Sequence, residues 1–202
     1  MNQSIAPENA QHPIGSTLSL RLKIETASEH ERMHQLMEKA DVFSFKQKYA
    51  QFTLSQYYFQ KEIEALFSNS NVTSIIPDLD IRGRSDAALL DLHDLGLAPT
   101  RNQALEKIKF PQALGWIYVS EGSTLGAAFL FKEAQKRLCL DAEFGARNLA
   151  AYPEGRMKVW RRFTQALDEF GFTQQQQDQI IRGALDGFAY FGEHLEHLDQ
   201  LK

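Results

Sequence analysis

Two histidines in the first quarter of the chain lie where an imidazole could bind a metal. With 100° between successive residues of a helix, residues 16–39 bring His30 onto the face that carries Leu22 and Met33, with His34 at the rim of that face. One interpretation is a buried histidine whose ring only hydrogen-bonds to a neighbour. The other is a neutral imidazole that points into a pocket as the axial ligand of a metal.

Lys23 lies close in angle to His30 on the same predicted helix, seven residues earlier. Seven residues correspond to about 10.5 Å along a helix. A ligand that lies along this helix would therefore present a metal to His30 and an anionic group to Lys23. The alternative is a solvated lysine whose aliphatic stem covers apolar surface.

Two glycines four residues apart, Gly122 and Gly126, interrupt the most hydrophobic helical segment of the chain, residues 111–138. Each glycine inside a helix costs about 1 kcal/mol relative to alanine, so the pair needs a physical reason. A close crossing of two helices is one reason. The other is a bulky flat ligand that approaches the backbone, or a helix that bends over such a ligand. Ser123 and Thr124 add hydroxyl groups for a ligand or a water molecule.

A different metal site, the di-iron centre of helical bundles, uses Glu-x-x-His pairs. The chain has one such pair, Glu31 and His34, and a separate pair of histidines, His194 and His197. A complete di-iron centre needs two Glu-x-x-His pairs and further inward carboxylates, which the sequence pattern does not assemble. Exposed helical charges are the simpler interpretation, and a di-iron oxidase stays an alternative.

The elements that must position these residues are helices. Apolar residues recur at helical spacing through most of the chain, and no stretch alternates as a strand does. We expect a flexible leader at residues 1–15 and one all-α domain, a multi-helix bundle, over residues 16–202. Ser85 and Thr173 are predicted N-caps, and Pro111 is the predicted first residue of its helix. The predicted helices cover residues 16–39, 45–67, 85–95, 111–138, 157–170 and the segment from 174 onward.

The composition excludes several classes of protein and of partner. The chain has 202 residues with 22 basic and 26 acidic side chains, a net charge of −4, and no basic block that would bind nucleic acid. No apolar run has the length of a membrane span, and the N-terminal residues do not resemble a signal peptide. The single cysteine, Cys139, excludes an internal disulfide and a cysteine-rich metal site. We expect a soluble cytoplasmic protein.

Two runs of sequence resemble the haem-binding helices of haem oxygenases. The run LKIETASEHERMHQLME, residues 22–38, is similar to their proximal helix. The run ALGWIYVSEGSTLGAAFLFK, residues 113–132, is similar to the distal helix of the bacterial members that produce biliverdin. The runs RSDAALLDLHDLG and KVWRRFTQALDEFG are also similar to family members, so the resemblance covers about residues 18–198. It implies the all-α haem oxygenase fold, with haem between a proximal and a kinked distal helix.

The resemblance assigns a role to the residues of the predicted proximal side. His30 matches the histidine that binds the haem iron as its axial ligand. Lys23 and Tyr118 match positions that hold a haem propionate in the bacterial members. Because both are present, we expect cleavage of haem at the α-meso carbon.

The same resemblance assigns the distal side. Gly122 and Gly126 match the glycines at which the distal helix bends and approaches the haem face, and Ser123 lies between them beside the distal water network. Arg84 resembles an arginine associated with the hydrogen bonds of that network. Ala127 departs from the family, many members of which have a further glycine there, and its methyl group would narrow the distal pocket.

The activity that the resemblance implies is the cleavage of haem to biliverdin, carbon monoxide and ferrous iron. The reaction consumes O₂ and takes electrons from a separate reductase or ferredoxin, and the chain has no flavin or nicotinamide motif of its own. A haem carrier or sensor that binds through His30 without turnover stays the second alternative, beside the di-iron oxidase.

Overall fold

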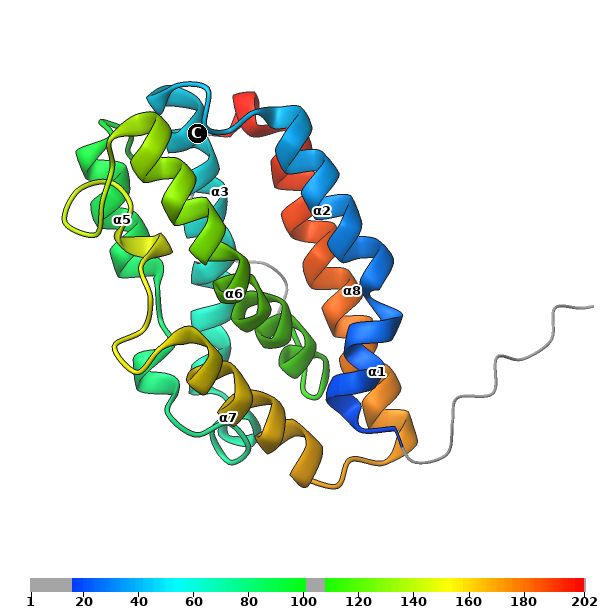
Figure 1. Cartoon of the computed structure of the whole chain (residues 1–202). Helices are drawn as coiled ribbons and strands as arrows, with labels where there is room; N and C mark the ends of the chain where they lie inside the picture. The colour runs from blue at the N-terminus through cyan, green and yellow to red at the C-terminus, as the bar shows by residue number, and fades with distance from the viewer. Residues whose placement is uncertain (1–15, 101–107, 202) are drawn as a thin grey trace, which may run out of the picture.

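The computed structural model describes residues 16–100 and 108–201, and within these ranges the protein is helical, with no strand (Figure 1). The predicted all-α class is therefore confirmed, whereas the predicted leader, residues 1–15, lies outside the described residues. No helix in the described ranges combines the length and the apolar character needed to cross a membrane. The helices are α1 (Leu18–Glu25), α2 (Ala27–Ala40), α3 (Lys46–Ala65), α4 (Ser70–Thr73), α5 (Ser85–Asp94), α6 (Gln112–Leu138), α7 (Arg156–Glu169) and α8 (Gln174–Glu196).

The packing of α6 against α8 lies at the centre of the bundle. A Cβ atom at Gly115 would lie 2.0 Å from the carbonyl oxygen of Ile180, and one at Gly183 would lie 2.1 Å from the carbonyl oxygen of Gln112. The backbones of the two helices therefore touch at a point where only glycine fits. Large side chains fill the space beside this contact, and Leu114 is among those fully buried.

The predicted single helix over residues 16–39 is wrong, because the chain forms two helices that meet at Thr26. This residue has φ −107° and ψ 6°, and it ends α1 and precedes α2. Its hydroxyl donates to the carbonyl of Leu22 at 2.8 Å, while the backbone hydrogen bond from His30 to Thr26 is kept at 3.0 Å. A threonine hydroxyl that bonds to the carbonyl four residues back is a known cause of local bending in helices.

Three predicted helix starts can be compared with the structure. Thr173 caps α8 as predicted, in a capping box with Gln176. Ser85 is not the cap of α5 but its first residue, because Glu64 of α3 accepts the backbone N–H groups of Arg84 and Ser85 at 2.6 Å each. A carboxylate from another helix thus replaces the local hydroxyl. Pro111 precedes the first helical residue of α6 by one position.

Helix α2 lies along α8, and an arginine ties the two together (Figure 1). Arg32 pairs with Glu29 of its own helix at 2.9 Å and with Glu196 of α8 at 3.0 Å. Gly192 makes room for this guanidinium, because a Cβ atom there would lie 2.4 Å from Arg32. The contact fixes the helix that carries both candidate metal-binding histidines.

Candidate active site

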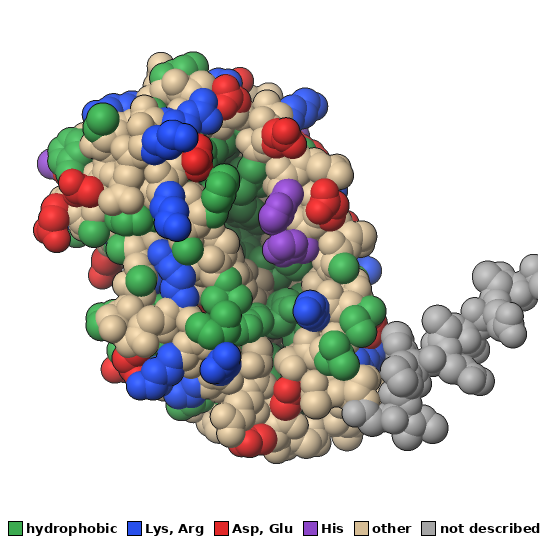
Figure 2. Space-filling model, viewed as in Figure 1, with side chains coloured by type: hydrophobic (Ala, Val, Ile, Leu, Met, Phe, Trp, Pro, Cys, Tyr) green, Lys and Arg blue, Asp and Glu red, His purple; other side chains and the backbone are tan. Residues whose placement is uncertain are grey.

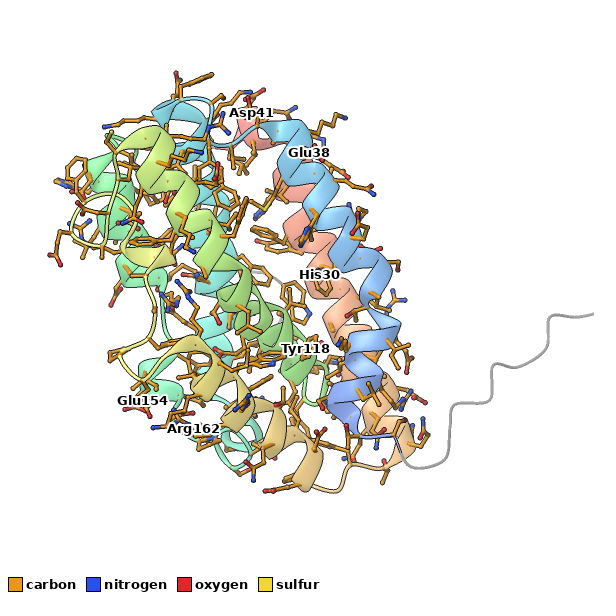
Figure 3. All side chains as sticks on the ribbon, in the orientation of Figure 1. His30, Glu38, Asp41, Tyr118, Glu154 and Arg162 are labelled. Atoms are coloured by element: carbon orange, nitrogen blue, oxygen red, sulfur yellow. The ribbon has the colours of Figure 1, made fainter. Side chains whose placement is uncertain are left out.

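A hollow separates α2 from α6. Figure 2 shows hydrophobic side chains on its floor, two neighbouring histidines on the α2 side, and lysine and arginine side chains along its edges. In Figure 3, His30 extends from α2 towards α6, and Tyr118 of α6 lies nearer the lower end of the same space. An apolar hollow with a basic edge suits a flat, mostly apolar ligand that carries anionic groups.

His30 is exposed to this hollow and lies beside His34, with 4.7 Å between the ring centroids. Partial burial lowers the pKa of His30, and a positive charge on His34 would lower it further, while Glu31 acts in the opposite direction. The ring is therefore kept neutral and has a lone pair for a metal.

Tyr118 joins the two walls of the hollow. It is buried, its side chain lies beside that of Thr26, and its ring lies 5.4 Å from the ring of Trp160. Burial raises the pKa of the Tyr118 hydroxyl, which therefore stays protonated. Lys23, in the last turn of α1, is exposed.

The two predicted distal glycines are not used for a helix crossing. A Cβ atom at Gly126 would meet nothing within 4 Å, and one at Gly122 would make only ordinary contact with the Trp160 ring at 3.7 Å. The helix-crossing interpretation therefore applies to Gly115 and Gly183 but not to this pair. Helix α6 continues through both distal glycines without a break in its helical assignment, so a bend there stays a prediction.

Ser123 lies between these glycines with an exposed side chain. Its hydroxyl donates to the carbonyl of Ser120 at 2.6 Å, an ordinary bond within a helix. The same oxygen keeps a lone pair with which it can accept a hydrogen bond from a ligand or a water molecule.

A buried ion pair directly behind α6 was not predicted. The Arg82 side chain is fully buried and donates to Glu121, the residue before Gly122, and also to Asp78 at 2.9 Å. Tyr152 donates to the Glu121 carboxylate at 3.4 Å. Burial raises the pKa of Glu121, and the positive charges of Arg82 and Arg84 oppose this. The signal in the sequence was an ionisable residue inside the most apolar helix.

Arg84 lies in the same buried region. Its guanidinium is 4.3 Å from the centroid of the Tyr152 ring and donates to the carbonyl of Asn148 at 2.9 Å. The Asn148 side chain also accepts from Gln60 at 3.0 Å and donates to Gln56 at 3.1 Å. Arg84 Nε and Gln60 Oε1 are buried without a hydrogen-bond partner among the described residues, which marks this cluster as a place for ordered water.

The structure brings some of the predicted residues together and leaves others apart. His30 and Tyr118 face one hollow, and Tyr118 and Gly122 both contact Trp160. Arg84 is linked to α6 through Tyr152, whose ring it covers and whose hydroxyl donates to Glu121. No group of three or more potential ligands gathers for a metal within the described ranges, so the cluster that a di-iron centre needs is not formed there.

A second hollow lies at the end of α5, away from α2. Its lining among the described residues is almost wholly apolar and offers one ionisable group there, His93. These residues include no pair of groups that could act on a ligand together, so we place no chemistry there. Its lining residues are Leu89, Leu90, His93, Leu97, Ala98 and Pro99.

The different surroundings of two glycines of α6 give the first prediction. Gly115→Ala forces two backbones apart and should lower the free energy of unfolding by about 1–3 kcal/mol. Gly126→Ala adds a methyl group in open space and should raise it by about 0.5–1 kcal/mol, because alanine favours the helix. Urea denaturation of the ligand-free protein measures both values. A loss of stability for Gly126→Ala would show that a close packing contact exists there.

The buried ion pair gives the second prediction. Glu121→Gln leaves Asp78 as the remaining carboxylate partner of the buried Arg82 and should lower the free energy of unfolding by about 1–3 kcal/mol. The double variant Arg82→Met/Glu121→Met removes both charges and should cost less than the single one. Urea denaturation compares the two, and an equal or smaller loss for the single variant would contradict the expected coupling.

Comparison with known proteins agrees with this geometry. A family model described as heme oxygenase matches residues 16–197. Heme oxygenase PigA of Pseudomonas aeruginosa is 38% identical over 196 residues, which cover 96% of this chain and 97% of that protein. The structure is similar to that of the heme oxygenase of Neisseria meningitidis, solved with NO and CO bound, with a TM-score of 0.86, 36% identity and coverage of 93% of this chain and 94% of that one.

More distant structures share the fold. A heme oxygenase from Leptospira interrogans superposes with a TM-score of 0.76 at 17% identity, over 89% of this chain and 98% of that one. Heme oxygenase 2 from Chlamydomonas reinhardtii superposes with a TM-score of 0.75 at 19% identity, over 91% of this chain and 98% of that one. The family model covers most of the chain, and PigA exceeds one-third identity over nearly all of it. The chain therefore belongs to the heme oxygenase family.

Proposed function

We propose that the protein binds haem in the hollow between α2 and α6 and cleaves it to biliverdin, carbon monoxide and ferrous iron. The observation that carries this proposal is the open space at Gly126, where α6 lacks a side chain although no atom of the described residues lies within 4 Å of the place that a Cβ atom would take. Haem supplies the iron at which O₂ is activated. The chain's own side chains and backbone bind and orient the haem.

His30 is the proposed axial ligand of the haem iron. Its ring extends into the hollow and is kept neutral by its surroundings, as an imidazole must be to bind a metal. A single imidazole on the α2 side leaves the opposite face of the haem free for O₂.

The proposed distal face is formed by a part of α6 that has glycine at two positions. Gly122 and Gly126 expose the backbone of α6, and the Ser123 hydroxyl offers only a mild hydrogen bond. Glu121 is the carboxylate nearest in sequence, but Arg82 and Tyr152 hold it in the buried region behind the helix. Glu121 is therefore not placed to act as a strong acid on a ligand in the hollow.

Lys23 and Tyr118 are the proposed partners of a haem propionate. The positive charge of Lys23 and the protonated hydroxyl of Tyr118 both suit a carboxylate. Holding the propionates fixes the rotation of haem in its own plane, which decides which meso carbon faces O₂. We infer the α isomer of biliverdin from this anchoring.

The electron donor is proposed to be a separate reductase or ferredoxin. The chain has no flavin or nicotinamide motif, which supports an external source for the electrons that the reaction consumes. The cytoplasmic location that the sequence predicts stays a prediction.

The third prediction concerns turnover. One equivalent of hemin should give a Soret band, and an electron donor in air should replace that band with biliverdin absorption. His30→Ala should lose the imidazole-bound spectrum and lower the rate of biliverdin formation at least about 100-fold, because it removes the iron ligand. His93→Ala, on α5, is the matched control and should react like the wild type. A stable Soret band in the reduced wild type would indicate a haem carrier, and no Soret band would refute the proposed site.

The fourth prediction concerns the product isomer. Lys23→Ala combined with Tyr118→Phe removes both polar partners of the propionate, while the phenyl ring keeps its packing against Trp160. Chromatography of the products should then show β or δ biliverdin beside the α isomer. A product that remains wholly α in the double variant would contradict the anchoring argument.

A further inference from the structure

A pair of imidazoles lies one helical turn apart on α2, and haem binding uses only one of them. His30 and His34 are both exposed with their rings side by side, and Figure 3 labels His30 on the α2 side of the hollow. Within the described ranges, neither ring takes part in a hydrogen bond with a protein group. Both rings therefore keep a nitrogen lone pair for another partner.

The rings have the spacing of two imidazoles on one metal ion. A zinc–nitrogen bond of about 2.0–2.1 Å puts each ring centroid about 3.2 Å from the metal. Two such rings at bond angles of 90° to 109° then have centroids about 4.5–5.2 Å apart. The observed separation is 4.7 Å, with 47° between the ring planes. The separation therefore matches neighbouring ligands of a tetrahedral or a square-planar ion.

The charge around the pair also favours a cation. Glu31 follows His30 directly, and its carboxylate acts electrostatically on that ring. Glu38 lies one further turn along α2, beyond His34, and is exposed. The positively charged Arg32, by contrast, is engaged by Glu29 and Glu196.

We propose that in the absence of haem His30 and His34 together bind a divalent transition metal ion that prefers imidazole, such as zinc, nickel or copper, with water at its remaining positions. Since no third protein ligand joins the pair in the described ranges, binding is weaker than at a structural zinc site. The proposal that His30 also binds the haem iron adds one consequence: the metal ion and haem exclude each other.

Calorimetric titration of the haem-free protein with zinc tests the site. The wild type should bind one zinc ion per chain, and EDTA should reverse the binding. In His34→Ala the Kd for zinc should rise at least about tenfold, since one imidazole cannot chelate the ion. The exposed His93 is the matched control, and His93→Ala should bind zinc like the wild type. Equal zinc binding by the wild type and His34→Ala would overturn the site.

A hemin titration with zinc present tests the exclusion. With zinc at about ten times its own Kd, the apparent Kd for hemin should rise about tenfold in the wild type and stay unchanged in His34→Ala. If haem-free wild type and His34→Ala had unequal melting temperatures, the loss of zinc binding in the variant would be traced to misfolding. That result would overturn the assignment of His34 as a zinc ligand. Zinc bound without any effect on hemin would overturn the exclusion. A wild type that binds no hemin would refute the proposed function, while the calorimetric titration still decides the metal site.

Discussion

The contact between the backbones of α6 and α8 is the constraint on which the rest of the structure depends. Gly115 and Gly183 let the two longest helices touch, and no other residue fits at either position without moving a backbone. On a regular helix Gly122 and Gly126, seven and eleven residues after Gly115, lie within about 20° of it on the same face. This face of α6 therefore packs tightly on α8 at its N-terminal end, whereas further along, at Gly122 and Gly126, the described residues make no close backbone contact with it.

Two polar connections then set the position of α6 relative to the rest of the site. Behind the helix, Arg82 binds Glu121 and ties α6 to the segment that precedes α5. At the lower end of the hollow, the Tyr118 side chain lies beside that of Thr26 at the junction of α1 and α2. The ion pair of Arg82 and Glu121 holds α6 in place. The contact of Tyr118 with Thr26 sets the separation of α6 from α1 and α2.

The sequence was sufficient to predict the all-α class, most of the helices and the helical face on which His30 lies, because these follow from apolar spacing along one segment, but it missed the break at Thr26. It was insufficient wherever the role of a residue depends on a contact with a segment that is distant in sequence. Gly115 and Gly126 look alike in sequence, and only α8 makes one of them a packing residue. Glu64, distant in sequence, took the capping role predicted for Ser85. Glu121 was not singled out although it is an ionisable residue inside the most apolar helix, and nothing in the sequence paired it with Arg82.

The junction at Thr26 has a mechanical consequence for the proximal wall. Lys23 belongs to α1 and His30 to α2, so the separation of these two side chains is set by the angle of a joint rather than by a rigid rod. A ligand held by both would span that joint and brace it at one angle. While it stays bound, the substrate would then help to hold the angle between α1 and α2. Its breakdown would release that angle again.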